Sequence, residues 1–380
     1  MKDKNRKQLN LYESTALIVS GTVGAGVLGI PFVVAKVGLM VGLVYIVVFG
    51  VLMTGLNLLI GEVLSKLKTN LQLVGLARKY LGRFGEFLMM SLVYSMAFGV
   101  LVVYIIGEGQ ALATLFGGSI FIWSILFFVF ATALIFVGMG VIKKVELITS
   151  LGLILIVVLI VFLNFSHFEV QNLVYVNWKF LFVPYGVLLF AYSGLATIPE
   201  AKSIIKGDKR IFKKSIILAG LINILIYSLF TLVVVGVTGA DTTEIATIGL
   251  GYKVGPIMLI LGNVFAVTAM GNSFLLTGLA LKDSFMWDFK MPKLLASIIV
   301  SVLPIILFLA GIRGFIQTID VIGGVFLSSQ MLLVLLIYWR AKQLGDLKTG
   351  RFKLHHVLFL IIILLLTLSG GIVYSILKWF

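Results

Sequence analysis

Two short segments combine residues that interrupt an apolar helix with backbone groups that can bind charge. The first, SGTVGAGVLGIP, runs from Ser20 to Pro31, and the second, FAYSGLATIPE, runs from Phe190 to Glu200. Glycine lets the backbone leave the helical conformation and lets a ligand approach closely, whereas proline removes one amide and frees a carbonyl one turn earlier. Amides at the start of a helix suit a carboxylate, and freed carbonyls suit an ammonium group or a cation. The chemistry that these segments favour is recognition of a small charged molecule by the backbone.

Two other interpretations apply to the first segment. Gly24, Gly26 and Gly29 match the spacing of the dinucleotide-binding fingerprint, but that motif requires a strand before it and an acidic residue about 20 positions later. The next acidic residue is Glu62, so we reject this match. Close packing of membrane helices through small residues remains open as an alternative.

The composition places both segments in a membrane. Of the 380 residues, 61% are hydrophobic and 12% are charged, and the mean hydropathy is +1.17. Apolar runs of about 20 residues, the length that crosses a bilayer core, recur along the chain. We therefore predict an all-α polytopic membrane protein with a single transmembrane domain over 1–380 and 11 transmembrane helices. The predicted spans are 12–36, 41–64, 87–115, 119–142, 145–165, 180–203, 212–237, 256–281, 294–311, 314–339 and 355–377.

The positive charges predict the orientation. The net charge is +15, and with a cytoplasmic N-terminus 25 of the 30 lysines and arginines lie on the inner side. This asymmetry follows the positive-inside rule, so we expect a multi-pass protein of the cell membrane with an extracellular C-terminus. We assign the basic clusters to anionic lipid at the inner surface rather than to nucleic acid.

The residue types argue against an enzyme. The chain has no cysteine, and His167, His355 and His356 lie at the edges of spans or in loops. Thiolate chemistry and cysteine metal sites are thereby excluded, and a histidine-based hydrolase is unsupported. We expect no catalytic residues and no cofactor, with a sodium ion as the one candidate metal.

The two segments echo each other. The pattern Gly-x-x-x-Ile-Pro begins at Gly26 and recurs at Gly194, five spans later. An odd number of crossings reverses the direction of the second copy, as in an inverted-topology repeat, and paired interruptions of this kind indicate a transport site near the membrane midplane. We predict repeats over about 12–165 and 180–339, followed by an extra helix over 355–377.

A site with both kinds of freed group fits a zwitterion. The half-helix that begins near Gly26 directs its amides into the cavity, and the carbonyls of Thr22, Val23 and the sixth span are freed. An unpaired backbone group costs several kcal/mol in hydrocarbon, so a ligand, water or protein must satisfy these groups. Free amino acids are the obvious candidates.

The two motifs resemble those of a known family. SGTVGAGVLGIPFVVAKVG is similar to the first-helix signature of the amino acid/auxin permease family, within the amino acid, polyamine and organocation transporter superfamily, and LLFAYSGLATIPEAKSIIK is similar to its sixth helix. The resemblance implies a LeuT-type five-plus-five inverted repeat with discontinuous helices 1 and 6. It also implies a moving bundle of helices 1, 2, 6 and 7, a scaffold of helices 3, 4, 8 and 9, and cation-coupled uptake of amino acids.

The resemblance also implies substrate contacts. The carboxylate contacts fall on the backbone of Gly24, Ala25 and Gly26. The amine contacts and the side-chain pocket fall around Phe190, Ala191, Tyr192 and Ser193. A tyrosine midway along the third helix often faces the substrate in related folds, and Tyr104 matches it best, although a packing role for this ring is an equal alternative.

A coupling ion is implied by sodium-coupled relatives. In those proteins a cation lies between first-helix carbonyls and hydroxyl groups of the eighth helix. The corresponding residues here are Ser20, Val23, Ala269, Asn272 and Ser273. Asn272 stands where threonine is common and Ser20 stands where asparagine is found, so hydrogen bonding between helices is an alternative role.

Protons are the other candidate driver. Glu108 lies one turn outward of Tyr104 and between Gly107 and Gly109. A charge in the bilayer centre is costly and a buried carboxyl favours its neutral form, so protonation of Glu108 can be coupled to substrate. A purely structural role is the alternative.

These observations favour one function over a second. We predict a secondary active transporter that imports amino acids by alternating access, with a small-molecule substrate and lipid as its partners. The alternative is an amino acid sensor or a channel-like protein of the same fold. The identity of the amino acid, the choice between sodium and protons, and the oligomeric state stay open at this level.

Overall fold

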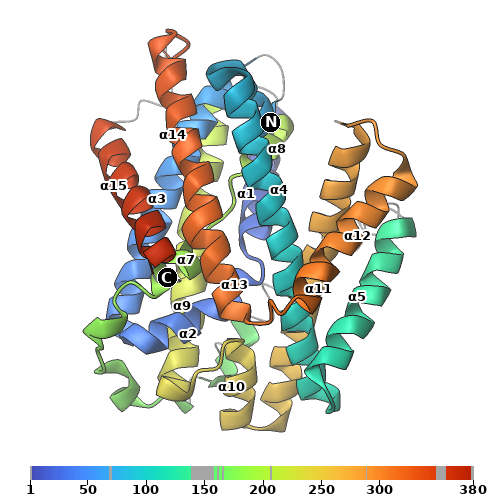
Figure 1. Cartoon of the computed structure of the whole chain (residues 1–380). Coiled ribbons are helices and arrows are strands. Elements are labelled where there is room, and N and C mark those ends of the chain that lie inside the picture. Colours follow the sequence, from blue (N-terminus) through green and yellow to red (C-terminus); the bar gives the residue numbers. More distant parts are fainter. Residues whose placement is uncertain are drawn as a thin grey trace.

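The computed structural model describes residues 2–67, 71–137, 158–160, 162–164, 167–205, 208–287, 289–347 and 357–377. All regular elements of these residues are helices, and most of them run roughly side by side in one bundle (Figure 1). The α-helices are α1 (Lys2–Thr22), α2 (Gly26–Val37), α3 (Leu39–Lys66), α4 (Leu73–Phe116), α5 (Ile120–Val137), α7 (Pro184–Ala191), α8 (Thr197–Ile204), α9 (Lys209–Thr238), α10 (Ala246–Val254), α11 (Pro256–Trp287), α12 (Lys293–Leu309), α13 (Phe315–Val321), α14 (Ser328–Gln343) and α15 (Val357–Leu377). The short elements are η2 (Val170–Leu173), η3 (Trp178–Phe180), η4 (Gly239–Asp241) and the π-helical η5 (Ile322–Leu327).

The predicted count of eleven spans is not confirmed. Among the described residues, seven helices are long and apolar enough to cross a membrane, or eight when α1 and α2 form one bent span. The predicted span 180–203 is divided into α7 and α8, which have 8 residues each, and α12 has 17 residues. The predicted span 145–165 lies almost wholly outside the described residues.

The third span differs from its predicted bounds of 87–115. Helix α4 begins at Leu73 and has 44 residues, because a first segment precedes the membrane part. Gly82 separates the two with φ 74° and ψ −164°, a conformation that glycine adopts without steric cost. The first segment buries Leu76 and Tyr80, and the Tyr80 hydroxyl donates to the Asp346 carboxylate at 2.8 Å.

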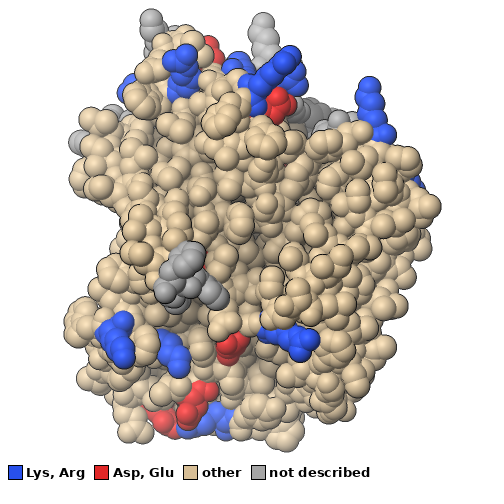
Figure 2. All heavy atoms as spheres, in the orientation of Figure 1, with Lys and Arg blue, Asp and Glu red and all other residues tan. Residues whose placement is uncertain are grey.

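The outer helices expose apolar faces. In α5 and α15 the mean hydropathy of the most apolar stretch is 2.7, yet only 17% of that stretch is buried. Charged side chains gather towards the two ends of the molecule, with a broad uncharged band between them (Figure 2). Apolar surface of this extent suits lipid, so the chain is a multi-pass membrane protein.

The helices pack in two groups around the interrupted segments. One group contains α1, α2, α3, α7, α8 and α9, in which α9 contacts α1, α2 and α3. The other contains α4, α5, α11 and α12, in which α4 contacts each of the other three. The first group holds the helices that the resemblance assigns to a moving bundle and the second those that it assigns to a scaffold, and α14 contacts both α3 and α4.

Candidate functional site

The backbone is interrupted in both predicted segments. Helix α1 ends at Thr22 and α2 begins at Gly26, with a bend of 58° between them. Helix α7 ends at Ala191, and α8 begins at Thr197. The glycines at these positions permit the departure from helical geometry that the sequence predicts.

The two interruptions have the same hydrogen-bond pattern. In each, a glycine amide bonds back two residues and two later amides bond back three residues, which tightens the start of the next helix. The matched pairs are Gly24 N to Thr22 O (3.0 Å) with Gly194 N to Tyr192 O (2.8 Å), Val27 N to Gly24 O (3.3 Å) with Thr197 N to Gly194 O (3.1 Å), and Leu28 N to Ala25 O (3.0 Å) with Ile198 N to Leu195 O (3.3 Å). The backbone therefore matches Gly24 with Gly194, and the register that the shared letters predict, Gly26 with Gly194, is wrong by two residues.

The two interrupted segments lie against each other. Helix α1 packs on α8 and α2 packs on α7. A Cβ atom at Gly26 would lie 2.6 Å from the Cα of Ala191, and one at Gly194 would meet the Thr22 hydroxyl. Only glycine permits this approach, so the structure brings together Gly26 and Ala191 as the sequence predicts.

Several backbone groups at the junction lack a backbone partner. The amide of Ala25 forms no hydrogen bond within the described part of the chain, and Gly26 is the first residue of α2, whose amide has no acceptor in that helix. The carbonyl of Ala191 receives no backbone amide there either. These groups are the two kinds that the sequence predicts, amides for an anion and a carbonyl for a cation.

The hydroxyl groups of the two segments serve their own helices. The Thr22 hydroxyl donates to Ile18 O at 2.7 Å, and the Ser193 hydroxyl donates to Phe190 O at 2.6 Å. The hydroxyl protons of Thr22 and Ser193 are therefore already used within their own segments.

The opposite wall comes from the second group of helices. Tyr104 of α4 is 6% exposed, and Ser273 belongs to α11. A Cβ at Gly24 would lie 3.7 Å from Ser273 Oγ and 4.0 Å from Tyr104 Oη. The structure thus places Tyr104 and Ser273 directly across from the first interruption.

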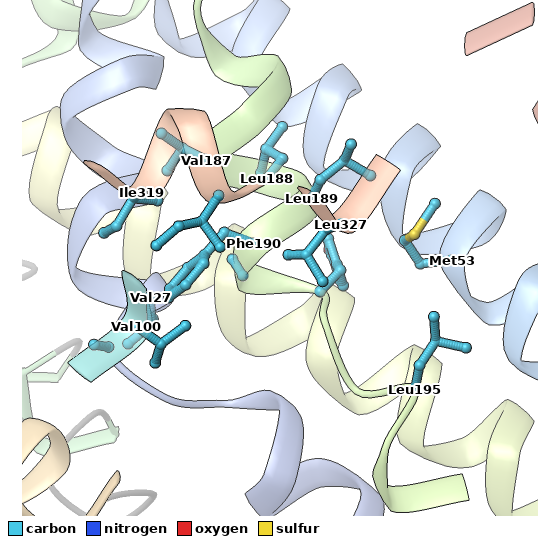
Figure 3. Close-up of a cluster of buried hydrophobic side chains, with 14 of the residues drawn as sticks. Val27, Met53, Val100, Val187, Leu188, Leu189, Phe190, Leu195, Ile319 and Leu327 are labelled. Carbon is cyan, nitrogen blue, oxygen red and sulfur yellow. The ribbon is translucent and has the colours of Figure 1, made fainter. Parts of the chain in front are cut away.

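The two aromatic residues of the second segment point in different directions. Phe190 lies in an apolar cluster with Val27 of α2 and Val100 of α4 (Figure 3). Tyr192 does not line the junction as predicted, because its hydroxyl donates to Ile46 O of α3 at 2.9 Å and its ring packs edge-on to Tyr227. Tyr192 therefore fastens the second segment to α3 and α9.

The predicted ion ligands are only partly brought together. Ser273 lies next to Gly24, whereas the Ser20 hydroxyl donates to Leu17 O of its own helix at 3.2 Å. Ala269 is buried in α11, and Asn272 is half-buried in the same helix. The Val23 carbonyl, which is the predicted ligand, accepts no backbone amide within the described residues. The described residues contain no group of three or more histidine or acidic side chains that could hold a metal ion.

Glu108 is an isolated carboxyl inside the second group. It is 0% exposed, and within the described residues neither carboxyl oxygen has a partner with ordinary hydrogen-bond geometry. A Cβ at Gly271 of α11 would lie 3.0 Å from Glu108 Oε1. By contrast, the buried Glu62 of α3 accepts a hydrogen bond from the Tyr338 hydroxyl at 3.1 Å.

Tyr227 of α9 is the site residue that the sequence analysis missed. It is fully buried, and its hydroxyl lies 2.7 Å from Ala191 O and 3.1 Å from Thr22 O. These carbonyls end α7 and α1. A tyrosine within an apolar helix carries no local signal of such a role.

A cavity of about 590 Å³ lies beyond the junction, between the C-terminal parts of α2 and α4 and the segment 243–252. Phe32 and Gln110 line it, each six residues beyond Gly26 and Tyr104, which corresponds to about 9 Å of helix. Glu244 also lines the cavity, and its carboxylate accepts a hydrogen bond from Ile316 N at 3.4 Å. Two helices therefore lead from this cavity to the interrupted segments.

Comparison with known proteins agrees with this architecture. The chain is 26% identical over 347 residues to Glutamine transporter 2 of Aliivibrio fischeri. The aligned region covers 87% of this chain and 89% of that protein. It is 22% identical over 359 residues to Tyrosine-specific transport system 1 of Haemophilus influenzae, covering 88% and 89%. Both relatives are amino acid transporters.

The fold is that of a solved structure. The crystal structure of MhsT in complex with L-phenylalanine matches with a TM-score of 0.66 and 14% sequence identity, covering 97% of this chain and 98% of that chain. The resemblance to the amino acid/auxin permease family is not confirmed by these comparisons. The profile of the tryptophan/tyrosine permease family matches residues 7–376, and the chain belongs to that family.

Proposed function

We propose that this protein is a secondary active transporter that imports a neutral amino acid across the cell membrane by alternating access. The observation that carries the proposal is the junction of the two interrupted segments, where the amides of Ala25 and Gly26 have no backbone acceptor among the described residues and Gly26 packs directly against Ala191, whose carbonyl ends α7. A zwitterion supplies an anion for the amides and a cation for the carbonyl. The tyrosine and glutamine transporters among the relatives support the same substrate class.

The architecture supports alternating access between two helix groups. The matched hydrogen bonds of Gly24 and Gly194 fit an inverted repeat of the LeuT type, with repeats over 12–165 and 180–339 and an additional helix over 355–377. We propose that the group with α1, α2, α7 and α8 rocks against the group with α4 and α11. With a cytoplasmic N-terminus, the 590 Å³ cavity is the outer entrance.

The substrate pocket in this proposal lies between the two groups. The carboxylate binds at Gly24, Ala25 and Gly26, the ammonium binds at the carbonyl end of α7, and Tyr104 closes the opposite side. Phe190 provides an apolar wall for the side chain, as its cluster with Val27 and Val100 suggests (Figure 3).

A direct test is transport by the purified protein in lipid vesicles. We expect saturable uptake of at least one of L-tyrosine, L-tryptophan and L-glutamine under a sodium or a pH gradient. A thermal-shift screen of the twenty amino acids with and without sodium identifies the ligand, because a ligand that binds the folded state raises its stability. Absence of saturable uptake under both gradients would reject the proposal.

Ser273→Ala tests sodium as the coupling ion. Ser273 lies beside Gly24, so with sodium as the driver we expect its removal to lower sodium affinity about tenfold, the effect of one lost ligand of about 1.4 kcal/mol. The measurement is the sodium concentration that gives half-maximal uptake.

Ser20→Ala is the comparison for this variant. The Ser20 hydroxyl already donates to Leu17 O, so we expect little change in sodium dependence. Equal effects of the two substitutions would contradict an ion site at Ser273.

A further inference from the structure

The two interrupted helices share a single hydrogen-bond donor. The Tyr227 hydroxyl lies within hydrogen-bond distance of Ala191 O, at 2.7 Å, and of Thr22 O, at 3.1 Å. These residues are the last of α7 and α1. One buried side chain on a third helix therefore contacts both carbonyl ends of the candidate substrate site.

One hydroxyl cannot satisfy both carbonyls fully. A phenol has a single proton to donate, whereas each carbonyl oxygen has two lone pairs. Thr22 O also accepts the Gly24 amide at 3.0 Å, but within the described residues Ala191 O has Tyr227 as its hydrogen-bond donor. Acceptor capacity therefore remains beside the Tyr227 hydroxyl.

An ammonium group fits that remaining capacity. It carries three donors and a positive charge, and the carbonyl ends of α1 and α7 both carry partial negative charge. When an ammonium group donates to these carbonyls, Ala191 O and Thr22 O no longer depend on the single Tyr227 proton. When the site is empty, Tyr227 supplies the only side-chain hydrogen bond to Ala191 O among the described residues.

We propose that Tyr227 is a positioning residue that replaces the substrate ammonium group when the carrier is empty. For net uptake by alternating access, the empty protein must change back from its inward-open to its outward-open state after each delivery. A buried carbonyl without a donor disfavours that empty state. The Tyr227 hydroxyl lowers this penalty and so favours the return step. This inference rests on the proposed transport function.

The test separates net uptake from exchange in vesicles that contain Tyr227→Phe. Net uptake requires the empty return, whereas exchange of L-tyrosine inside for labelled L-tyrosine outside does not. We expect net uptake to fall at least tenfold and exchange to stay within about threefold of wild type, with L-tyrosine affinity equal or higher. Tyr185→Phe is the matched control, because it removes another buried tyrosine hydroxyl, bonded to Ser328 at 2.9 Å, and should leave the ratio of net uptake to exchange unchanged.

Other outcomes overturn the inference. Equal losses of net uptake and exchange would give Tyr227 a structural role alone, and unchanged net uptake would give it none. If wild-type protein neither takes up nor exchanges amino acids, the proposed function itself fails.

A second measurement keeps the Tyr227 hydroxyl and so tests the inference even if Tyr227→Phe does not fold. With 3-fluorotyrosine encoded at position 227, we expect the fluorine resonance to move when L-tyrosine is added. Addition of 3-(4-hydroxyphenyl)propionate, which lacks the amino group, should not move it. The same shift with both compounds, or no shift with either, would overturn the inference.

Discussion

Replacement of Gly26 by alanine is expected to reduce amino acid uptake to about 1% of the wild-type rate or less. A methyl group there would lie 2.6 Å from the Cα of Ala191 and 2.9 Å from its Cβ, so α2 must move away from α7. Overpacking against a rigid backbone costs about 3 kcal/mol, which corresponds to roughly a hundredfold in rate or binding. The measurement is the initial rate of uptake into vesicles, normalised to the amount of folded protein.

Gly29→Ala is the matched control in the same helix. Its methyl group would meet Ile316 Cδ1 at 2.9 Å, the flexible end of a side chain, which can turn aside at small cost. We expect uptake within about threefold of wild type. If Gly26→Ala transports as well as Gly29→Ala, the close contact of the two interrupted segments is not needed for function.

Replacement of Glu108 by glutamine is expected to remove the response of uptake to an imposed pH gradient if protons drive transport. Glutamine keeps the shape of a neutral carboxyl but cannot release a proton. Because Glu108 is fully buried and without an ordinary hydrogen bond among the described residues, the neutral side chain should also leave thermal stability intact. We expect at least a tenfold loss of pH-driven accumulation with exchange preserved.

Glu62→Gln is the control for a buried carboxyl with a partner. Glu62 bonds to Tyr338 in α14, away from the interrupted segments, and its replacement should leave the response to the pH gradient unchanged. A Glu108→Gln variant that is stimulated by the gradient as strongly as wild type would contradict a proton site at Glu108. Sodium would then be the remaining candidate, and Ser273→Ala is the variant that tests it.

Gly26→Ala and Tyr227→Phe are expected to impair transport in different ways. Gly26→Ala changes the distance between two helices and so affects every step of transport. Tyr227→Phe removes one hydrogen bond and is expected to affect the empty carrier selectively. Together the two variants distinguish the effect of the distance between the helices from the effect of an empty substrate site.

The amino-acid sequence by itself determined the membrane class, the helical architecture and the positions of both interruptions. Apolar length and backbone chemistry are local properties, and the glycines near Gly24 and Gly194 act on their own turns of helix. The candidate pairing of two segments 170 residues apart was also visible, since both carry the same kind of interruption. Its register was not, because shared letters do not report which amide bonds to which carbonyl.

Only the tertiary structure decided which side chains meet at the junction. The rotation of α9 brings the Tyr227 hydroxyl to the carbonyls of Thr22 and Ala191, whereas Tyr192 turns away to Ile46. The structure also shows a segment from Leu73 ahead of the predicted third span, with the break at Gly82. In a chain that is apolar almost throughout, the hydrophobic pattern does not specify which face of a helix points inward. Contacts between helices distant in sequence set that direction, and they become visible only once the helices are packed.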